Sequence, residues 1–247
     1  GNLWRFPWMT SENGGAAFLL VYLGVVLLVG VPGLLAEFVI GRGSRRNPVG
    51  ALSDLSESSA WSAFGHVFVV TAVVLLSFYS VVGGWILRYF AGSFTGAYFG
   101  APGAYFDSIN YGVEAVGFHL LFLGVTALIV LRGVRRGIER ATKLMMPAIV
   151  VLLLALAAWG VTLDGASEGL AFYLSPDIAF LQANFLHILP AAAGQALFTL
   201  SLGAGTMLTY ASYLGEDRSL AADGTAIAVL NTFVGVLAGV VVFPILF

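Results

Sequence analysis

Residues 194–213, GQALFTLSLGAGTMLTYASY, are apolar enough to cross a bilayer, yet Ser201, Gly203 and Gly205 interrupt them near the middle. Glycine is among the poorest helix formers, and a serine side chain competes for the backbone hydrogen bonds of a helix. We therefore predict a broken helix. Backbone freed at membrane depth is tolerated only where it faces protein or a water-filled cavity, so the break is a candidate binding site. Close packing of the two glycines at a helix interface is the alternative.

The composition places the whole chain in a membrane. Of its 247 residues, 59% are hydrophobic and only 10% are charged. The long apolar runs lack the two-residue alternation of barrel strands, so we predict an all-α membrane protein with about seven transmembrane segments. The absence of cysteine excludes disulfides and thiolate metal sites. We expect membrane lipid and a small molecule as partners, and no nucleic acid, while the oligomeric state stays open.

The apolar segments can be placed along the chain. Residues 1–13 are half a span, because a full span takes about 20 residues. Further spans are expected at 16–41, 62–95, 115–131, 140–163, in the broken segment, and from about residue 223 onward. The chain opens without an initiator methionine and closes inside an apolar run, so we expect it to be a fragment.

The basic residues predict the orientation. Eight of the eleven Lys and Arg lie in two clusters, at 42–46 and 132–143. Because positive charge gathers on the cytoplasmic side, residues 42–60 and 132–143 are predicted to be cytoplasmic. The loops 96–113 and 164–186 contain no Lys or Arg and are predicted to be extracellular. The expected location is the cell membrane, crossed several times.

Four costly polar side chains lie in predicted spans, namely Asn2, Arg5, Glu37 and Asn231. Intramembrane groups of this kind are functional candidates by default. The oxygens of Asn2 and Asn231, with Thr199 beside the break, suit a hard monovalent cation such as sodium. Hydrogen bonding between the amides of two helices is the alternative.

The remaining polar residues have two interpretations each. Glu37 needs donors, and unwound amides between Ser201 and Gly205 would supply them, so its expected role is to hold the break open; a proton site is the alternative. Arg5 either reaches the outer interface with its charged end or forms half of an ion-pair gate. Tyr79, at mid-span, is expected to carry a buried hydroxyl that needs a partner, and an aromatic residue of the interfacial belt is the alternative.

Three motifs resemble those of one transporter family. The opening GNLWRFP at 1–7, followed by ENGG at 12–15, is similar to the first-helix signature of the neurotransmitter:sodium symporter family. FTLSLG at 198–203 and TYASY at 209–213 resemble the sixth helix of its prokaryotic amino-acid transporter branch. RGVRRGIE at 132–139 resembles the loop between helices four and five. The resemblance covers the whole chain, from helix 1b to helix 7.

The resemblance implies two inverted repeats with broken helices 1 and 6. Residues 1–163 would be the first repeat without helix 1a, and residues 164–247 the truncated start of the second. It also implies a sodium-coupled symporter for an amino acid or related amine, with both ligands at the unwound helices. The alternatives are an incomplete fragment that does not transport, which we expect of this chain alone, or a membrane enzyme. An enzyme would need a nucleophile and base or a metal cluster at membrane depth, and HExxH and paired intramembrane aspartates are absent.

The resemblance also assigns roles to single positions. The positions that match the first sodium site are Asn2, Thr199 and Asn231. The positions that would hold the substrate's carboxylate or line its side-chain pocket are Gly1, Leu75, Tyr79, Phe198, Ser201 and Ala204. Arg5 and Gln195 would form part of the outer gate and Tyr213 part of the inner gate, while Glu37 would brace the unwound helix.

Two departures from the family pattern affect ligands. The positions that match a chloride site are Tyr22, Gln195, Thr199 and Asn231. Gly235 stands where many prokaryotic members carry a carboxylate and animal members a serine, so the chloride requirement stays open. Ala204 is small where some amino-acid transporters carry Phe, which predicts a wide pocket for a bulky apolar or aromatic side chain. Residues of a second sodium site would lie outside this sequence, and the identity of the substrate stays open.

Overall fold

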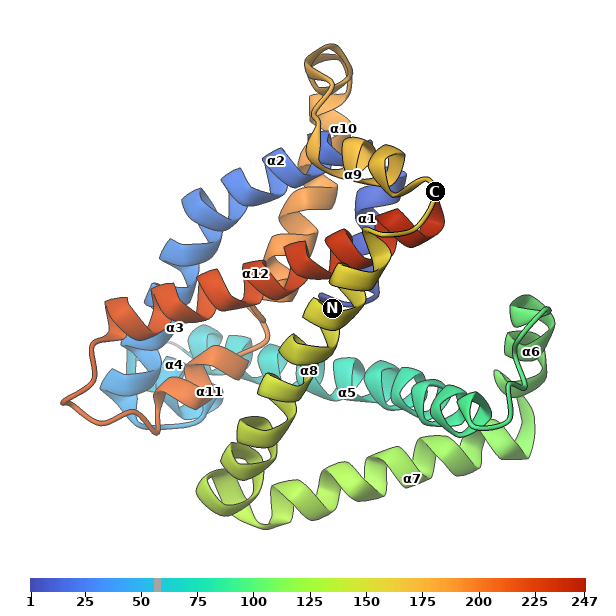
Figure 1. Ribbon diagram of the computed structural model, residues 1–247. Helices are drawn as coiled ribbons and strands as arrows, with labels where there is room; N and C mark the ends of the chain where they lie inside the picture. Colours follow the sequence, from blue (N-terminus) through green and yellow to red (C-terminus); the bar gives the residue numbers. More distant parts are fainter. Residues whose placement is uncertain (56–58) are drawn as a thin grey trace. The chain divides into compact units, whose positions relative to one another are not determined.

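The computed structural model describes residues 1–55 and 59–247, and the regular structure of these residues is entirely helical (Figure 1). The prediction of an all-α protein is therefore confirmed. The helices, in chain order, are α1 (Arg5–Glu12), α2 (Ala16–Val25), η1 (Val26–Gly30), α3 (Val31–Ser44), α4 (Pro48–Leu55), α5 (Ser59–Ser93), α6 (Pro102–Ile109), α7 (Gly112–Leu131), η2 (Val134–Ile138), α8 (Glu139–Gly160), α9 (Ala166–Leu174), α10 (Ile178–Thr199), α11 (Thr206–Ala211) and α12 (Leu220–Leu246).

Five continuous helical segments among the described residues are long and apolar enough to cross a membrane. They are Ala16–Ser44, Ala60–Ser93, Gly112–Leu131, Val134–Gly160 and Leu220–Leu246. The other two predicted segments are shorter or divided. α1, in the predicted half-span 1–13, has eight residues, and the predicted broken segment is split between α10 and α11. The protein is thus a multi-pass membrane protein, with five unbroken crossings where about seven segments were expected.

Several predicted loops contain helix. Loop 164–186 contains α9, and α10 begins within it. The Asp177 carboxylate caps α10 by accepting a hydrogen bond from the Phe180 amide at 2.9 Å. Loop 96–113 contains α6, and the predicted cytoplasmic segment 42–60 contains α4. Residues 56–58 of that segment lie outside the described residues.

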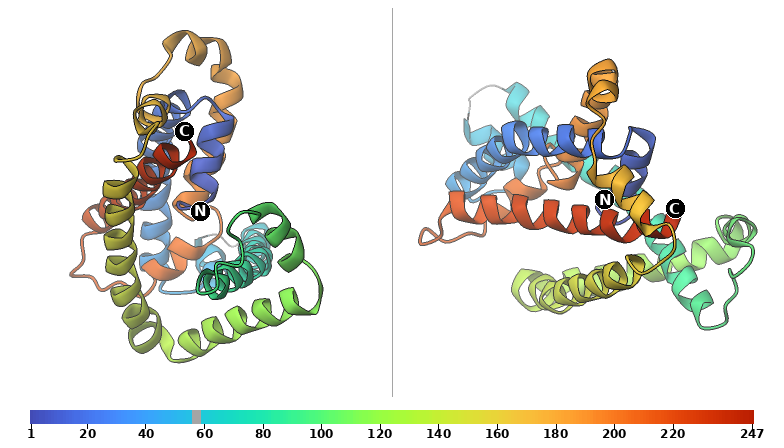
Figure 2. Two further views of the ribbon diagram at one scale, coloured as in Figure 1. Left: turned by 45° about the vertical axis from the view of Figure 1, so that its right-hand side comes forward. Right: turned by 45° about the horizontal axis from the view of Figure 1, so that its top comes forward.

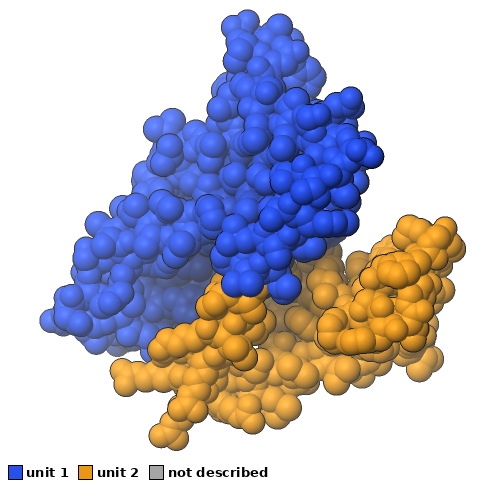
Figure 3. Space-filling model, in the orientation of Figure 1, with its two compact units in different colours: residues 1–69, 149–247 blue, residues 70–148 orange. Residues whose placement is uncertain are grey.

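The chain divides into two compact units, shown in different colours in Figure 3. Unit 1 comprises residues 1–69 and 149–247, and unit 2 comprises residues 70–148. Each unit is described by itself below. The repeats predicted at 1–163 and 164–247 are defined by symmetry, whereas the two units are defined by contacts. The units therefore do not test the repeats, which stay a prediction.

Unit 1 holds the break and the polar residues near it. In this unit α2 packs against α10, α3 against α11, and α12 against both α3 and α9 (Figures 1 and 2). Phe6, Phe18 and Tyr22 are fully buried and form an aromatic cluster, with 4.9 Å between the ring centroids of Phe6 and Tyr22. This cluster attaches α1 to α2 and so fixes the start of the chain inside the unit.

Unit 2 is held by polar contacts at one end of its helices. The Arg88 side chain of α5 donates to Glu114 of α7 and, at 2.9 Å, to the Tyr105 hydroxyl of α6. Tyr105 also packs against Tyr89 and Tyr98, with ring centroids 5.2 and 5.8 Å away. Arg88 thus links three helices, and no functional role had been expected for it.

Candidate functional site

The helix breaks where the sequence predicts it. α10 ends at Thr199 and α11 begins at Thr206, so residues 200–205 are not helical. Ser201, Gly203 and Gly205 have φ angles of 56°, 77° and 67°, all in the left-handed region. Glycine adopts this region without steric cost, whereas serine is strained there. The three residues that predicted the break are the residues that turn the chain.

Glu37 of α3 faces the break. Its Oε1 accepts a hydrogen bond from the backbone amide of Gly203 at 2.8 Å, and the Leu208 backbone also lies against the carboxylate. The other carboxylate oxygen, Oε2, is buried and has no hydrogen-bond partner among the described residues. The sequence placed the donors of Glu37 between Ser201 and Gly205, and Gly203 lies within that range.

Asn2 and Asn231 meet although 229 positions separate them in the sequence. The Asn2 side-chain amide donates to the Asn231 backbone oxygen at 3.0 Å and to its side-chain oxygen at 3.2 Å. Both carbonyl oxygens retain accepting capacity, because an amide oxygen has two lone pairs. The two residues therefore present a pair of neutral oxygens between the start of the chain and the middle of α12.

A second polar chain runs from α1 to the end of α10. Gln195 is fully buried, and its amide donates to the Thr199 hydroxyl at 3.0 Å while its side-chain oxygen accepts from Arg5. The Arg5 guanidinium also lies 4.9 Å from the centroid of the Phe198 ring, within the range of a cation–π interaction. The predicted pair of gate residues, Arg5 and Gln195, is therefore in direct contact.

Tyr22 adds a buried hydroxyl to this region. Its side chain is fully buried, and its hydroxyl has no hydrogen-bond partner among the described residues, although Thr199 and Thr232 lie beside it. The Thr232 hydroxyl is also buried without a partner. Buried polar groups are nearly always paired, so these hydroxyls are candidates for contact with a ligand. Sequence reasoning missed Thr232, and the signal available was its position directly after Asn231 in a span.

The other predicted site residues belong to both units. Leu75 and Tyr79 belong to α5 in unit 2, so their placement against the break stays a prediction. Ala204 lies within the break and is buried, and Tyr213 is 67% exposed just beyond α11. Gly1 is exposed and lies in the four residues that precede α1.

The chemistry of the site favours an alkali cation over a transition metal. Among the described residues, no group of three or more His, Cys, Asp or Glu side chains is placed to hold a metal ion. The candidate ligands Asn2, Thr199 and Asn231 offer neutral oxygens, which suit hard cations rather than zinc or copper. Three neutral oxygens match the low charge of a monovalent ion.

The chain contains one sequence pattern that is typical of hydrolases. A Gly-x-Ser-x-Gly pattern, which sequence reasoning overlooked, occurs at residues 165–169. In hydrolases this pattern lies on a sharp turn between a strand and a helix. Here it lies at the start of α9, and no strand precedes it in the described part of the chain. The pattern therefore lacks the structural context of a nucleophile.

Comparison with known proteins gives consistent matches. Residues 1–100 and 106–247 match the Sodium:neurotransmitter symporter family. The uncharacterized sodium-dependent transporter YhdH of Bacillus subtilis is 38% identical over 252 residues, which cover 100% of this chain and 55% of that protein. The sodium-dependent neutral amino acid transporter B(0)AT2 of Bos taurus is 27% identical over 281 residues, covering 100% of this chain and 38% of that protein.

A solved structure shares the fold. The crystal structure of MhsT in complex with L-phenylalanine matches with a TM-score of 0.89 and 43% identity, covering 98% of this chain and 56% of that chain. The chain spans about half the length of the curated bacterial and archaeal relatives it matches. The matched family consists of symporters rather than enzymes, which excludes the enzyme alternative. With nearly its whole length matched, the chain belongs to the sodium:neurotransmitter symporter family.

Proposed function

We propose that the protein is a sodium-coupled symporter for an amino acid or a related amine, and that both ligands bind beside the broken helix. The observation that carries the proposal is the contact between Asn2 and Asn231, at 3.0 and 3.2 Å, in a chain of this family whose residues 200–205 are not helical. Relatives named as sodium-dependent transporters support sodium as the driving ion.

The sodium ion would bind the oxygens of Asn2, Thr199 and Asn231. These oxygens carry no net charge, so they leave the charge of the sodium ion uncompensated. A substrate carboxylate that completes the coordination shell is stabilised by the cation, and the cation is stabilised by the carboxylate. Each ligand then raises the affinity of the other, and by linkage the two effects are equal in free energy. A gradient of one ligand can thereby drive movement of the other.

The substrate would be a bulky apolar or aromatic amino acid. The proposed pocket residues are Gly1, Leu75, Tyr79, Phe198, Ser201 and Ala204. Support comes from the small side chain of Ala204 in the break and from the 43% identical MhsT, whose structure holds L-phenylalanine. Arg5 and Gln195 would close the outer side above Phe198, which fits their contact in unit 1, and Tyr213 would belong to the inner gate.

Chloride would bind beside the sodium ligands. The unpartnered Tyr22 hydroxyl, with Gln195, Thr199 and Asn231, forms the proposed anion site. A Cβ atom added to Gly235 would lie 3.9 Å from the Asn2 Cβ, so a carboxylate at that position would stand beside the cation, and glycine supplies none. Replacing chloride by gluconate should reduce transport, and Gly235→Glu should relieve that dependence while Gly235→Ala should not.

Residues 42–60 and 132–143 would face the cytoplasm, and residues 96–113 and 164–186 would face outward. The concentration of arginine in the first pair of segments supports this orientation. Labelling single introduced cysteines from outside intact cells tests it, because residues 1–247 contain no cysteine of their own. Labelling of the arginine-rich segments from outside would reverse the assignment.

Reconstitution tests the function. The protein, expressed at the full length of its reading frame, is placed in liposomes, and uptake of labelled leucine and phenylalanine is followed with an inward gradient of sodium or of potassium. We expect uptake in the sodium gradient only. Equal uptake in both gradients would contradict sodium coupling. Competition by glycine and alanine that exceeds competition by leucine, phenylalanine or tryptophan would contradict the wide pocket.

A further inference from the structure

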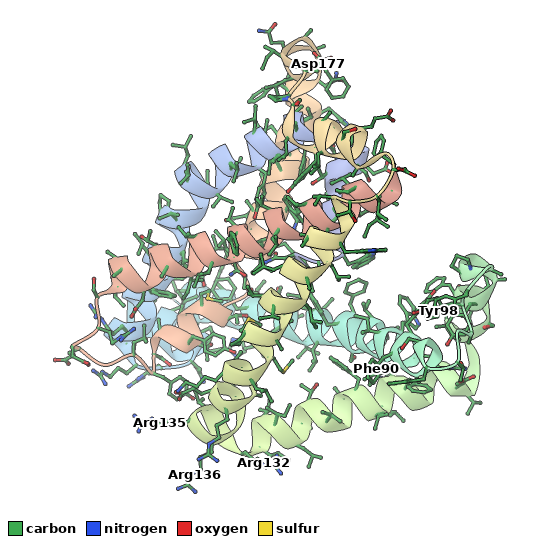
Figure 4. The ribbon with its side chains drawn as sticks, viewed as in Figure 1. Phe90, Tyr98, Arg132, Arg135, Arg136 and Asp177 are labelled. Atoms are coloured by element: carbon green, nitrogen blue, oxygen red, sulfur yellow. The ribbon has the colours of Figure 1, made fainter. Side chains whose placement is uncertain are left out.

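The turn between α7 and α8 contains a surface pocket of about 340 Å³. It is lined by Arg132, Arg136 and Arg140 together with Ile129, Gly137 and Ala141. Figure 4 shows Arg132, Arg135 and Arg136 gathered at this turn. We propose that the pocket, here called the arginine pocket, binds the phosphate group of an anionic phospholipid.

Among the described residues, no acidic side chain pairs with the three arginines of the arginine pocket. Residues 132–143 contain five basic residues and the single acid Glu139, and Glu139 is already paired with Lys143 at 2.6 Å. Like charges this close repel one another, so the cluster is favourable only when an anion joins it.

The backbone builds the pocket. α7 ends at Leu131, and Gly133 turns the chain with a φ of 79°. A Cβ atom at Gly137 would collide with the Ile129 carbonyl oxygen, so the absent side chain lets the start of the next helix lie directly on the end of α7. This close approach brings Arg132, which follows α7, onto the same pocket as Arg136 and Arg140.

The pocket lies at the depth of the lipid head groups. The apolar span Gly112–Leu131 ends one residue before Arg132, and Arg136 and Arg140 fall in the first turns of the span Val134–Gly160. Leu131 and Leu144 flank the turn and are 82% and 76% exposed, so apolar surface for an acyl chain adjoins the cationic site. A free phosphate would gain nothing from that surface, and for this reason we assign a lipid.

Arginine suits this ligand. A guanidinium group presents paired donors that match two phosphate oxygens, and it remains charged at all physiological pH values. Basic residues next to a span contribute to binding of anionic lipid by about fivefold in affinity each, or about 1 kcal/mol. Three unpaired arginines around one pocket should therefore distinguish anionic from zwitterionic lipid clearly.

The test compares two variants that remove equal charge. In the first, Arg132, Arg136 and Arg140 are changed to Gln. In the matched control, the changed residues are Arg42, Arg45 and Arg46, which already have partners: Arg45 pairs with Glu216 at 3.3 Å, Arg46 with Asp54 at 3.1 Å, and Arg42 donates to the Arg218 carbonyl oxygen at 2.7 Å. Native mass spectrometry of the purified protein in detergent gives the apparent affinity for dihexanoyl phosphatidylglycerol, dihexanoyl phosphatidylcholine and inorganic phosphate.

From the contribution of each unpaired arginine given above, we expect the arginine-pocket variant to bind phosphatidylglycerol more than tenfold more weakly. The affinity of the control variant should change less than about twofold, because its arginines already have partners. The single variant Arg136→Gln should lose about fivefold, which keeps the proposal testable if the triple variant does not fold. Equal losses in the two triple variants, or equal binding of phosphatidylcholine, would overturn the proposal. Competition by inorganic phosphate at the same concentration as the lipid would assign the pocket to a free anion and overturn it as well.

Discussion

Replacing Glu37 should loosen the broken segment of the helix. The Glu37 carboxylate accepts from the Gly203 amide at 2.8 Å, and a hydrogen bond to a charged group contributes about 1.5–3 kcal/mol. Since Oε2 is buried without a hydrogen-bond partner among the described residues, its desolvation offsets part of this stabilisation, and we take about 2 kcal/mol for the net effect. Glu37→Leu removes the acceptor and should cost that amount. Glu37→Gln keeps an acceptor and should cost about half as much.

Hydrogen exchange measures this effect locally. A loss of about 2 kcal/mol raises the opening equilibrium about 30-fold, so amides in residues 200–205 should exchange about 30-fold faster in Glu37→Leu. The control is Glu216→Gln, because the Glu216 side chain is 89% exposed and its ion pair with Arg45 contributes little. If exchange across 200–205 rises no more in Glu37→Leu than in this control, Glu37 does not hold the break.

Two further substitutions test the packing of unit 1. Gly41→Ala should lower stability by about 1–3 kcal/mol in thermal unfolding, because the added Cβ meets the Leu208 carbonyl oxygen, whereas Gly43→Ala meets nothing within 4 Å and should not. Tyr173→Phe should cost about 1 kcal/mol through loss of the 3.0 Å hydrogen bond to the Val236 oxygen. Burial raises the pKa of the Tyr173 hydroxyl, so the unfolded chain loses the hydroxyl proton at a lower pH than the folded protein does, and stability falls as pH rises above about 10. The Tyr173→Phe variant should lose this part of the pH dependence of stability. An unchanged pH profile in the variant would contradict the prediction.

The sequence predicts those features that depend on local chemistry. Ser201, Gly203 and Gly205 are poor helix formers whatever surrounds them, so the break could be placed to within a few residues. The all-α membrane class follows from composition for the same reason. The start of α10 lies inside the predicted loop 164–186, because the Asp177 carboxylate caps the helix there and a cap of this kind stabilises a helix start.

Contacts between distant segments are harder to predict. The pairing of Asn2 with Asn231 was expected because both are amides in spans and because the family resemblance assigns both to one sodium site, while nothing in their local sequence sets their 3.0 Å contact. Thr232 was missed although it directly follows Asn231, because only the structure shows the buried Tyr22 hydroxyl beside it. A side chain's partners depend on packing across the unit, and single-sequence patterns carry no such information.

The decisive quantity is the sodium dependence of substrate binding in Asn231→Ala, with Asn184→Ala as the matched control. Asn184 is half-buried, and its side-chain amide donates at 3.0 Å to the Phe180 carbonyl oxygen within its own helix. Binding of labelled phenylalanine is titrated against sodium in each variant. If Asn2, Thr199 and Asn231 hold the cation beside the break, Asn231→Ala should weaken sodium activation about tenfold or more and lower substrate affinity with it, while Asn184→Ala changes neither. Unchanged sodium activation in Asn231→Ala would show that the cation binds elsewhere.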